Sequence, residues 1–254
     1  MKTRILISIA LLFSITRVWS QANVDRIPLI GEDAPSFTAE STSGQITFPD
    51  NFGTKWKILF SHPADFTPVC SSEILELAQM QNDFDNLGVK VAVISTDTLY
   101  MHKHWKESLE TLKYKGKDPA QINFPIIEDK SWNASKEYGM LHYPVSTSKD
   151  VRGVFIIDPK NKVRAIYFYP MEVGRNMDEI KRTVIALQTA DREKVLIPAN
   201  WKPGDDVLIP YDRTSKKNED LKPAAIDKKT YKVSWYMTFM KSGENGDIDL
   251  SDKQ

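Results

Sequence analysis

Two apolar strands separated by an amphipathic helix constrain the fold of this chain more than any other feature. Residues 56–60 and 89–95 are short runs rich in β-branched and aromatic side chains, a composition typical of buried strands. Between them, apolar residues recur at helical spacing from Val69 onward, and Gly88 supplies a stop. This strand–helix–strand unit predicts an α/β fold.

Later elements extend the same pattern. Helices are predicted at 99–112, at 131–138 with Gly139 as the stop, and at 176–189, and two strands at 151–157 and 162–168 flank a turn containing Pro159. The order describes a mixed sheet flanked by helices, as in thioredoxin-like folds. Beyond about residue 200 the chain is Pro-rich and charged, with an aromatic stretch at 231–240 that suits a strand. We therefore expect one domain over residues 21–195 and a smaller C-terminal arm with a polar tail over 196–254.

The first twenty residues differ from the rest. Two basic residues precede an apolar run over 5–15, and the tripeptide at 18–20 suits cleavage before Gln21. The run is too short to cross a hydrocarbon core, which needs about twenty residues. We predict a signal peptide over residues 1–20, export to the periplasm or the medium, and no stable membrane insertion. A hydrophobic N-terminal strand and an uncleaved anchor are the alternatives.

Composition excludes several classes of function. Lys and Arg total 34, as do Asp and Glu, so there is no basic excess for binding nucleic acid. The chain has one cysteine, which rules out the intramolecular disulfide that an exported protein can form. His102, His104 and His142 lack the spacing of a zinc site. We predict neither a metal nor a cofactor.

The single cysteine, Cys70, lies where the first strand passes into the helix. The segment 61–70 places it in the first helical turn, where unpaired N–H groups and the helix dipole favour a thiolate. Pro63 and Pro68 suit a rigid turn. If the turn is helical, the Thr67 hydroxyl faces the sulfur; otherwise Thr67 simply caps the helix. By position alone, a reactive thiolate and an inert buried cysteine are both open.

Four segments match a known pattern in the right order over roughly residues 28–240. They lie at 60–70, which contains the signature formed by Pro63, Thr67 and Cys70, and at 124–127, 151–159 and 169–176. On these residues the chain resembles the peroxiredoxins of the AhpC/TSA superfamily, and specifically the one-cysteine, peroxiredoxin-6-like class.

The resemblance implies a fold, an assembly and an activity. The fold is thioredoxin-like with a small C-terminal peroxiredoxin arm, whose Trp235 and Tyr236 suit a partner-facing surface in a homodimer or higher homo-oligomer. The activity is a peroxidase that reduces hydrogen peroxide and organic hydroperoxides to water and alcohols. Because the chain has no second cysteine, an external thiol of unknown identity must resolve the sulfenic acid.

Roles are implied for four catalytic residues. Cys70 matches the peroxidatic cysteine that becomes a sulfenic acid. Thr67 matches the residue that hydrogen-bonds the peroxide, and Pro63 the proline that shields the sulfur. Arg152 matches the arginine that stabilises the thiolate and the leaving oxygen. Apart from the resemblance, Arg152 reads as a surface arginine on a strand edge.

Three supporting residues are implied as well. Glu73 matches a carboxylate that orients the arginine, Arg175 a second arginine near the pocket, and His62 a histidine of the one-cysteine class. Each has an ordinary interpretation: a solvated acid in the first turn, a surface arginine at a helix start, and a hydrogen-bonded structural histidine.

Rival functions share the predicted fold. A peroxide sensor or holdase chaperone uses the oxidation of Cys70 without sustained turnover. A noncatalytic binding module keeps the fold with an inert cysteine. A thiol-disulfide oxidoreductase is disfavoured because the chain has no Cys-x-x-Cys.

Overall fold

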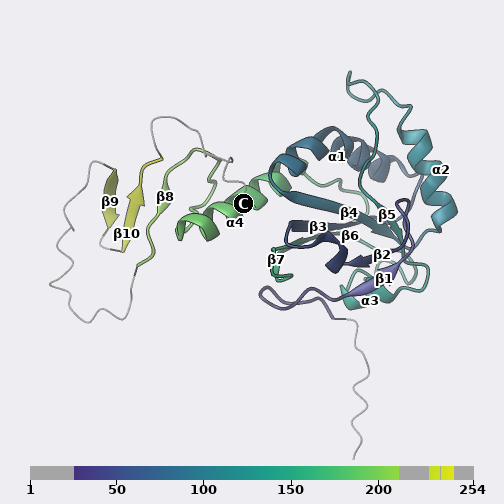
Figure 1. Ribbon diagram of the computed structural model, residues 1–254, viewed down its shortest axis with the longest axis horizontal. Helices are drawn as coiled ribbons and strands as arrows, with labels where there is room; N and C mark the ends of the chain where they lie inside the picture. The colour runs from purple at the N-terminus through teal and green to yellow at the C-terminus, as the bar shows by residue number, and fades with distance from the viewer. Residues whose placement is uncertain (1–25, 212–228, 235, 243–254) are drawn as a thin grey trace, which may run out of the picture.

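A five-stranded mixed sheet forms the centre of the computed structural model, which describes residues 26–211, 229–234 and 236–242 (Figure 1). Its strands, in spatial order, are β5 (Ile126–Glu128), β4 (Val89–Ser95), β3 (Trp56–Ser61), β6 (Arg152–Ile157) and β7 (Val163–Tyr169). β3, β4 and β5 run parallel, whereas β6 and β7 are antiparallel to their neighbours. The sheet is the mixed sheet that the sequence predicts.

Both faces of the sheet are covered. One face packs against α1 (Pro68–Asn86), α2 (Leu99–Leu109) and α4 (Met177–Glu193), and the other against α3 (Asn133–Glu137) and the hairpin of β1 (Phe37–Ala39) and β2 (Ile46–Phe48), which leads into the 3₁₀ helix η1 (Asp50–Phe52). Ile58 and Phe60 of β3 enter the first core, and Leu59 between them enters the second. A strand buried on both faces reads as a continuous apolar run, which explains the pattern at 56–60.

Element boundaries differ from the predicted ones in a few places. α2 ends at Leu109 rather than 112, and α4 continues to Glu193, followed by Lys194 with a left-handed φ of 57°. The short strand β5 was not predicted, because its three residues show no alternation that separates a strand from a loop.

The C-terminal arm forms a small antiparallel sheet of its own. It contains β8 (Val207–Leu208), β10 (Met237–Met240) and β9 (Thr230–Ser234), so the predicted strand at 231–240 is in fact a hairpin. In Figure 1 this sheet stands clear of the main domain, beyond α4. A small core around the buried Trp201 attaches the arm to α4. No helix in the described ranges is long and apolar enough to cross a bilayer.

Three sequence predictions concern residues that the structure does not describe. The signal peptide at 1–20, the polar tail from 243 onward and the side chain of Trp235 lie outside the described residues.

Candidate active site

Cys70 lies in the first turn of α1 and is fully buried. Thr67 is the N-cap residue with extended backbone angles, and Pro68 occupies the first helical position, where its missing N–H costs nothing. The strand–turn–helix path from β3 therefore places the sulfur beside unpaired backbone N–H groups, as predicted.

Arg152, the first residue of β6, contacts the sulfur directly. Its Nη1 donates to Cys70 Sγ at 3.3 Å and to Glu73 Oε2 at 2.8 Å. Its Nε and Nη2 both donate to the carbonyl of Met171, at 3.0 and 2.5 Å. The residue is buried, so the surface-arginine interpretation of Arg152 is wrong.

Arg175 is held on the other side of Glu73. Its backbone N and its Nε donate to Glu73 Oε1 at 2.8 and 2.9 Å, and its Nη2 donates to Oε2 at 2.7 Å. Its guanidinium carbon lies 3.2 Å from the centre of the Phe60 ring, a cation–π contact. Glu73 and Arg175 are both buried, so the solvent-exposed interpretations of these two residues are also wrong. We call Cys70, Glu73, Arg152 and Arg175 the arginine cluster.

The charges of the arginine cluster balance only when the sulfur is ionised. Burial opposes ionisation of Glu73, but hydrogen bonds and charge from Arg175, joined by Arg152, lower its pKa below the ordinary value. Two guanidinium groups and one carboxylate leave one positive charge without a partner in a buried site. An ionised sulfur at Cys70 would balance that charge.

Thr67 and Pro63 both belong to the turn before Cys70. Pro63 is buried, and the Thr67 hydroxyl donates to the carbonyl of Ala64 at 2.8 Å. Because Thr67 has an extended backbone, the helical turn that would aim its hydroxyl at the sulfur is absent, and its side chain does not cap α1 either. Because the Thr67 hydroxyl donates its proton to the Ala64 carbonyl, its oxygen still has lone pairs that can accept a hydrogen bond.

His62 belongs to a second buried group on the same turn. Its Nε2 lies 2.8 Å from Asp65 Oδ1, while Asp65 Oδ2 lies 2.7 Å from His102 Nδ1. Burial opposes ionisation of Asp65, but hydrogen bonds from His102 and His62 lower its pKa to about 2. We call His62, Asp65 and His102 the histidine cluster; it agrees with the structural interpretation of His62.

Sequence reasoning missed Asp65 and His102 as partners. Asp65 lies inside the signature, three residues after His62, and this spacing could have indicated that the two side chains meet. His102 is 37 residues beyond Asp65, so no local spacing indicates its contact. Its neighbour Trp105 on α2 lies against His62, with tilted rings whose centres are 5.0 Å apart, and donates from Nε1 to Ser71 Oγ at 3.2 Å. α2 therefore contacts the active-site turn on both sides of Cys70.

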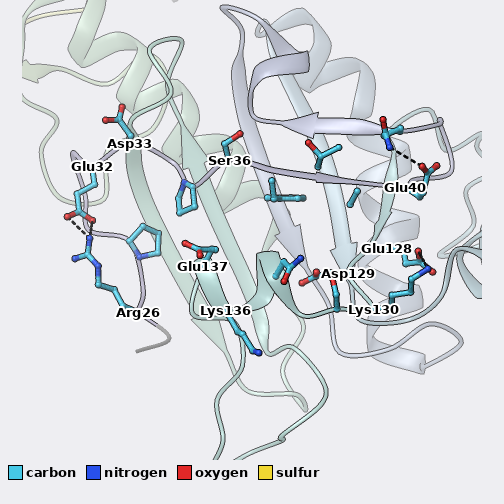
Figure 2. A pocket seen from close by; sticks show the side chains of 18 of the residues that line it. Arg26, Glu32, Asp33, Ser36, Glu40, Glu128, Asp129, Lys130, Lys136 and Glu137 are labelled. Carbon is cyan, nitrogen blue, oxygen red and sulfur yellow. Dashed lines mark hydrogen bonds and ion pairs between the residues drawn. The ribbon is translucent and has the colours of Figure 1, made fainter. Parts of the chain in front are cut away.

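A separate groove of about 1450 Å³ is lined mainly by the segment 26–40 and by residues 128–137, which include α3 (Figure 2). None of the residues of the arginine or histidine clusters lines it. Three acids along it are already paired, with Arg26, Lys130 and Lys162. Among the described residues, no three His, Cys, Asp or Glu side chains are grouped so that they could hold a metal ion.

A buried cysteine sulfur in the first turn of a helix, contacted by an arginine that a carboxylate holds, is the arrangement that a thiol-dependent peroxidase on a thioredoxin-like fold needs. The comparisons with known proteins agree. The model of the AhpC/TSA family matches residues 30–166, and that of the C-terminal domain of 1-Cys peroxiredoxin matches residues 186–222. A peroxiredoxin of Methanosarcina mazei is 51% identical over 185 residues, which cover 72% of this chain and 84% of that protein. The chain belongs to the AhpC/TSA family of peroxiredoxins.

Solved structures show the same class. Peroxiredoxin 6 of Arenicola marina, as a cysteine-to-serine mutant, aligns with a TM-score of 0.74 at 32% identity and covers 85% of this chain and 99% of its own. A yeast mitochondrial 1-Cys peroxiredoxin aligns with a TM-score of 0.71 at 38% identity, covering 85% of this chain and all of its own. The predicted thioredoxin-like fold and one-cysteine class are confirmed. The protein is a peroxidase whose oxidised cysteine requires an external thiol.

Proposed function

We propose that Cys70 is the residue that attacks the peroxide, and the contact of 3.3 Å between Arg152 Nη1 and Sγ carries this proposal. The thiolate forms a bond to the terminal oxygen while the O–O bond breaks. The sulfur is oxidised to a sulfenic acid and the peroxide is reduced; the leaving oxygen takes a proton and departs as water or alcohol. Arg152 stabilises the thiolate first and the charge on the departing oxygen afterwards.

The remaining predicted residues have supporting roles in this proposal. Thr67 accepts a hydrogen bond from the peroxide, since its own proton is donated to Ala64. Buried Pro63 shields the sulfur from water. Glu73 and Arg175 fix the position of Arg152, and His62 anchors the turn through Asp65.

Rapid mixing of the reduced protein with one equivalent of hydrogen peroxide tests the proposal. We expect the Cys70 thiol to be lost orders of magnitude faster than a free thiol, and Arg152→Ala to slow the reaction by about 10²- to 10³-fold. Arg164→Ala is the matched control, because Arg164 on β7 pairs with Asp191 and contacts no residue of the arginine cluster. Oxidation of the wild-type protein at the rate of a free thiol contradicts the proposal and favours the binding module.

Sustained turnover distinguishes the enzyme from a peroxide sensor or holdase chaperone. The yeast relative's structure concerns thiol resolution through glutathione and thioredoxin systems. We propose that a thiol of one of these two kinds reduces Cys70 here. Many peroxide molecules consumed per protein with such a thiol support the peroxidase, whereas a single oxidation that neither thiol reverses supports the sensor.

A homodimer is proposed on the basis of two surfaces. The outer edge of β7 has no partner strand from residue 164 to 169 within the described residues, and such an edge suits pairing with a second copy. In the arm of residues 196–254, Val233 and Tyr236 are 63% and 55% exposed. Light scattering of the full chain at micromolar concentration should give a dimer mass or higher; monomer alone contradicts this.

Export is proposed on the basis of the basic residues and the apolar run in segment 1–20. Fractionation of the native host should place the protein outside the cytoplasmic membrane, and mass spectrometry of the purified protein should give an N-terminus near Gln21. An intact Met1 on a cytoplasmic protein contradicts it.

A further inference from the structure

The pairing between β3 and β6 stops one residue short of the active site. The antiparallel register runs from Lys57 opposite Ile157 to Phe60 opposite Val154. The next opposed pair is Ser61 and Gly153, where the backbone ladder ends. Instead, the carbonyls of both residues accept hydrogen bonds from Arg175 Nη1, each at 2.7 Å. Arg175 therefore occupies a gap in the ladder.

The Ser61 side chain replaces the missing ladder bonds. Its hydroxyl donates to the carbonyl of Val151 at 2.7 Å and accepts from the N–H of Gly153 at 2.8 Å. The same N–H also lies 3.0 Å from the Val151 carbonyl, which closes a three-residue turn with Arg152 at its centre. One buried hydroxyl thus bonds to both peptide neighbours of the arginine that contacts the sulfur.

Gly153 provides the space for this arrangement. A Cβ at position 153 would lie 2.9 Å from Ser61 Oγ and 3.2 Å from the rings of Phe155 and Phe168. Any larger residue would push the hydroxyl away from the turn. The glycine and the serine are therefore complementary.

We infer that Ser61 is a positioning residue for peroxide reduction, which sets the place of both arginines: Arg152 through its hydroxyl and Arg175 through its carbonyl. This inference rests on the proposed role of Arg152. When the hydroxyl is removed, the turn carrying Arg152 loses its direct bonds to the Ser61 side chain and is tied to β3 only through the neighbouring Val154 and through Arg175, while Cys70 on α1 keeps its own contacts. The guanidinium then shifts relative to the sulfur, and a misplacement of about 1 Å can cost about 100-fold in rate.

The test compares two reactions of Cys70 in the full-length chain. Reaction with hydrogen peroxide depends on the placement of Arg152 against the O–O bond, whereas alkylation by iodoacetamide needs an accessible thiolate but no group aligned with an O–O bond. Both are followed by rapid mixing for the wild type, Ser61→Ala and Ser61→Thr, at a pH where Cys70 is fully ionised in each. Ser41→Ala is the matched control: Ser41 is also buried, donates to the Gly44 carbonyl at 2.6 Å and accepts from the Ser43 N–H at 3.1 Å, far from the site in sequence.

We expect Ser61→Ala to slow the peroxide reaction by about 10- to 100-fold with a much smaller change in alkylation. Ser61→Thr, which keeps the hydroxyl, should recover most of the rate, and Ser41→Ala should match the wild type. Peroxide oxidation of Ser61→Ala at the wild-type rate overturns the inference and leaves the proposed function standing. Equal losses in both reactions overturn it as well, because they indicate a general disturbance. A wild-type protein that reacts like a free thiol instead removes the proposed function on which the inference rests.

Discussion

The arginine cluster and the histidine cluster lie on the two sides of one short turn, and each contains a single carboxylate between two cationic or ionisable side chains. In the first, Glu73 lies between Arg152 and Arg175; in the second, Asp65 lies between His62 and His102. The difference is in the protons. A guanidinium does not lose its proton in a protein, whereas an imidazolium does.

The two histidines differ in the partners of their ring nitrogens. His102 Nε2 lies 3.1 Å from the Ile127 carbonyl and its Nδ1 lies 2.7 Å from Asp65 Oδ2, so both ring nitrogens have a polar partner. His62 donates from Nε2, and its buried Nδ1 has no partner in the described part of the chain. Burial lowers the pKa of His62, against the opposing effect of Asp65, so this ring is neutral. Asp65 therefore has one neutral partner in His62, whereas both partners of Glu73 carry a permanent charge.

The largest predicted effect is the loss of the carboxylate from the arginine cluster. Glu73→Gln leaves two permanent buried charges facing one thiolate, and we expect the free energy of unfolding in urea to fall by about 3–5 kcal/mol. Glu76→Gln, one turn further along α1, is the control. Glu76 pairs with Lys115 and Lys117 at the surface, so its loss should cost at most about 1 kcal/mol. Similar small losses for both variants would contradict the charge balance argued for the site.

Asp150 is a third buried acid, and among the described residues it forms no hydrogen bond with an arginine or a histidine. Neither oxygen of Asp150 has a hydrogen-bond partner among the described residues, and burial raises its pKa to about 7. An acid with a raised pKa loses stabilisation as pH rises from its unfolded value toward its folded one. The free energy of unfolding of Asp150→Asn, relative to that of the wild type, should therefore rise by about 3 kcal/mol between about pH 4 and pH 7. Urea unfolding across that pH range measures it. A difference that does not change with pH would contradict a protonated Asp150.

Asp65 gives the opposite pH dependence with a smaller size. Its pKa is about 2 in the fold against 3.8 for the free group, so its contribution is complete above about pH 4 and is lost as pH falls toward 2. Asp65→Asn should be less stable than the wild type by about 2 kcal/mol at neutral pH, and the gap should close in acid. The cost is below that of Glu73→Gln because neutral His62 leaves no charge behind, whereas both guanidinium groups stay charged. A gap that persists unchanged in acid would mean that the carboxylate is not the group being lost.

The two clusters differ in how many of their contacts the sequence predicts. Hydrophobic periodicity predicts β3, α1 and β4 and therefore places Cys70 in the first turn of a helix. The approach of Arg152 and Arg175 to Glu73, 79 and 102 residues away along the chain, follows only from the resemblance to a family. Residue type alone predicts a surface position for both arginines, and tertiary packing overrides that preference.

Neither hydrophobic periodicity nor the signature predicts the contacts within the histidine cluster. His102 lies on the buried face of α2, at a spacing of three from Trp105, and this pattern indicates a core-facing histidine without naming its partner. Ser61 is similar: a serine at the end of a strand carries no signal until the opposite strand is known. Contacts that depend on which strands are neighbours are the part that a single sequence does not determine.

The smallest predicted effect concerns the contact between α2 and the helix turn that contains Cys70. The bond from Trp105 Nε1 to Ser71 Oγ is 3.2 Å long and neutral, and hydrogen bonds of this kind contribute about 0.5–1.5 kcal/mol. A double-mutant cycle of Trp105→Phe with Ser71→Ala isolates it, since the lost indole volume cancels, and we expect a coupling energy of about 0.5 kcal/mol or more. The control cycle uses Ser72→Ala, because Ser72 bonds to the Val69 carbonyl instead. If both cycles give zero, the bond to Ser71 contributes nothing to stability, and α2 holds the turn through His102 against Asp65 and the Trp105 ring against His62.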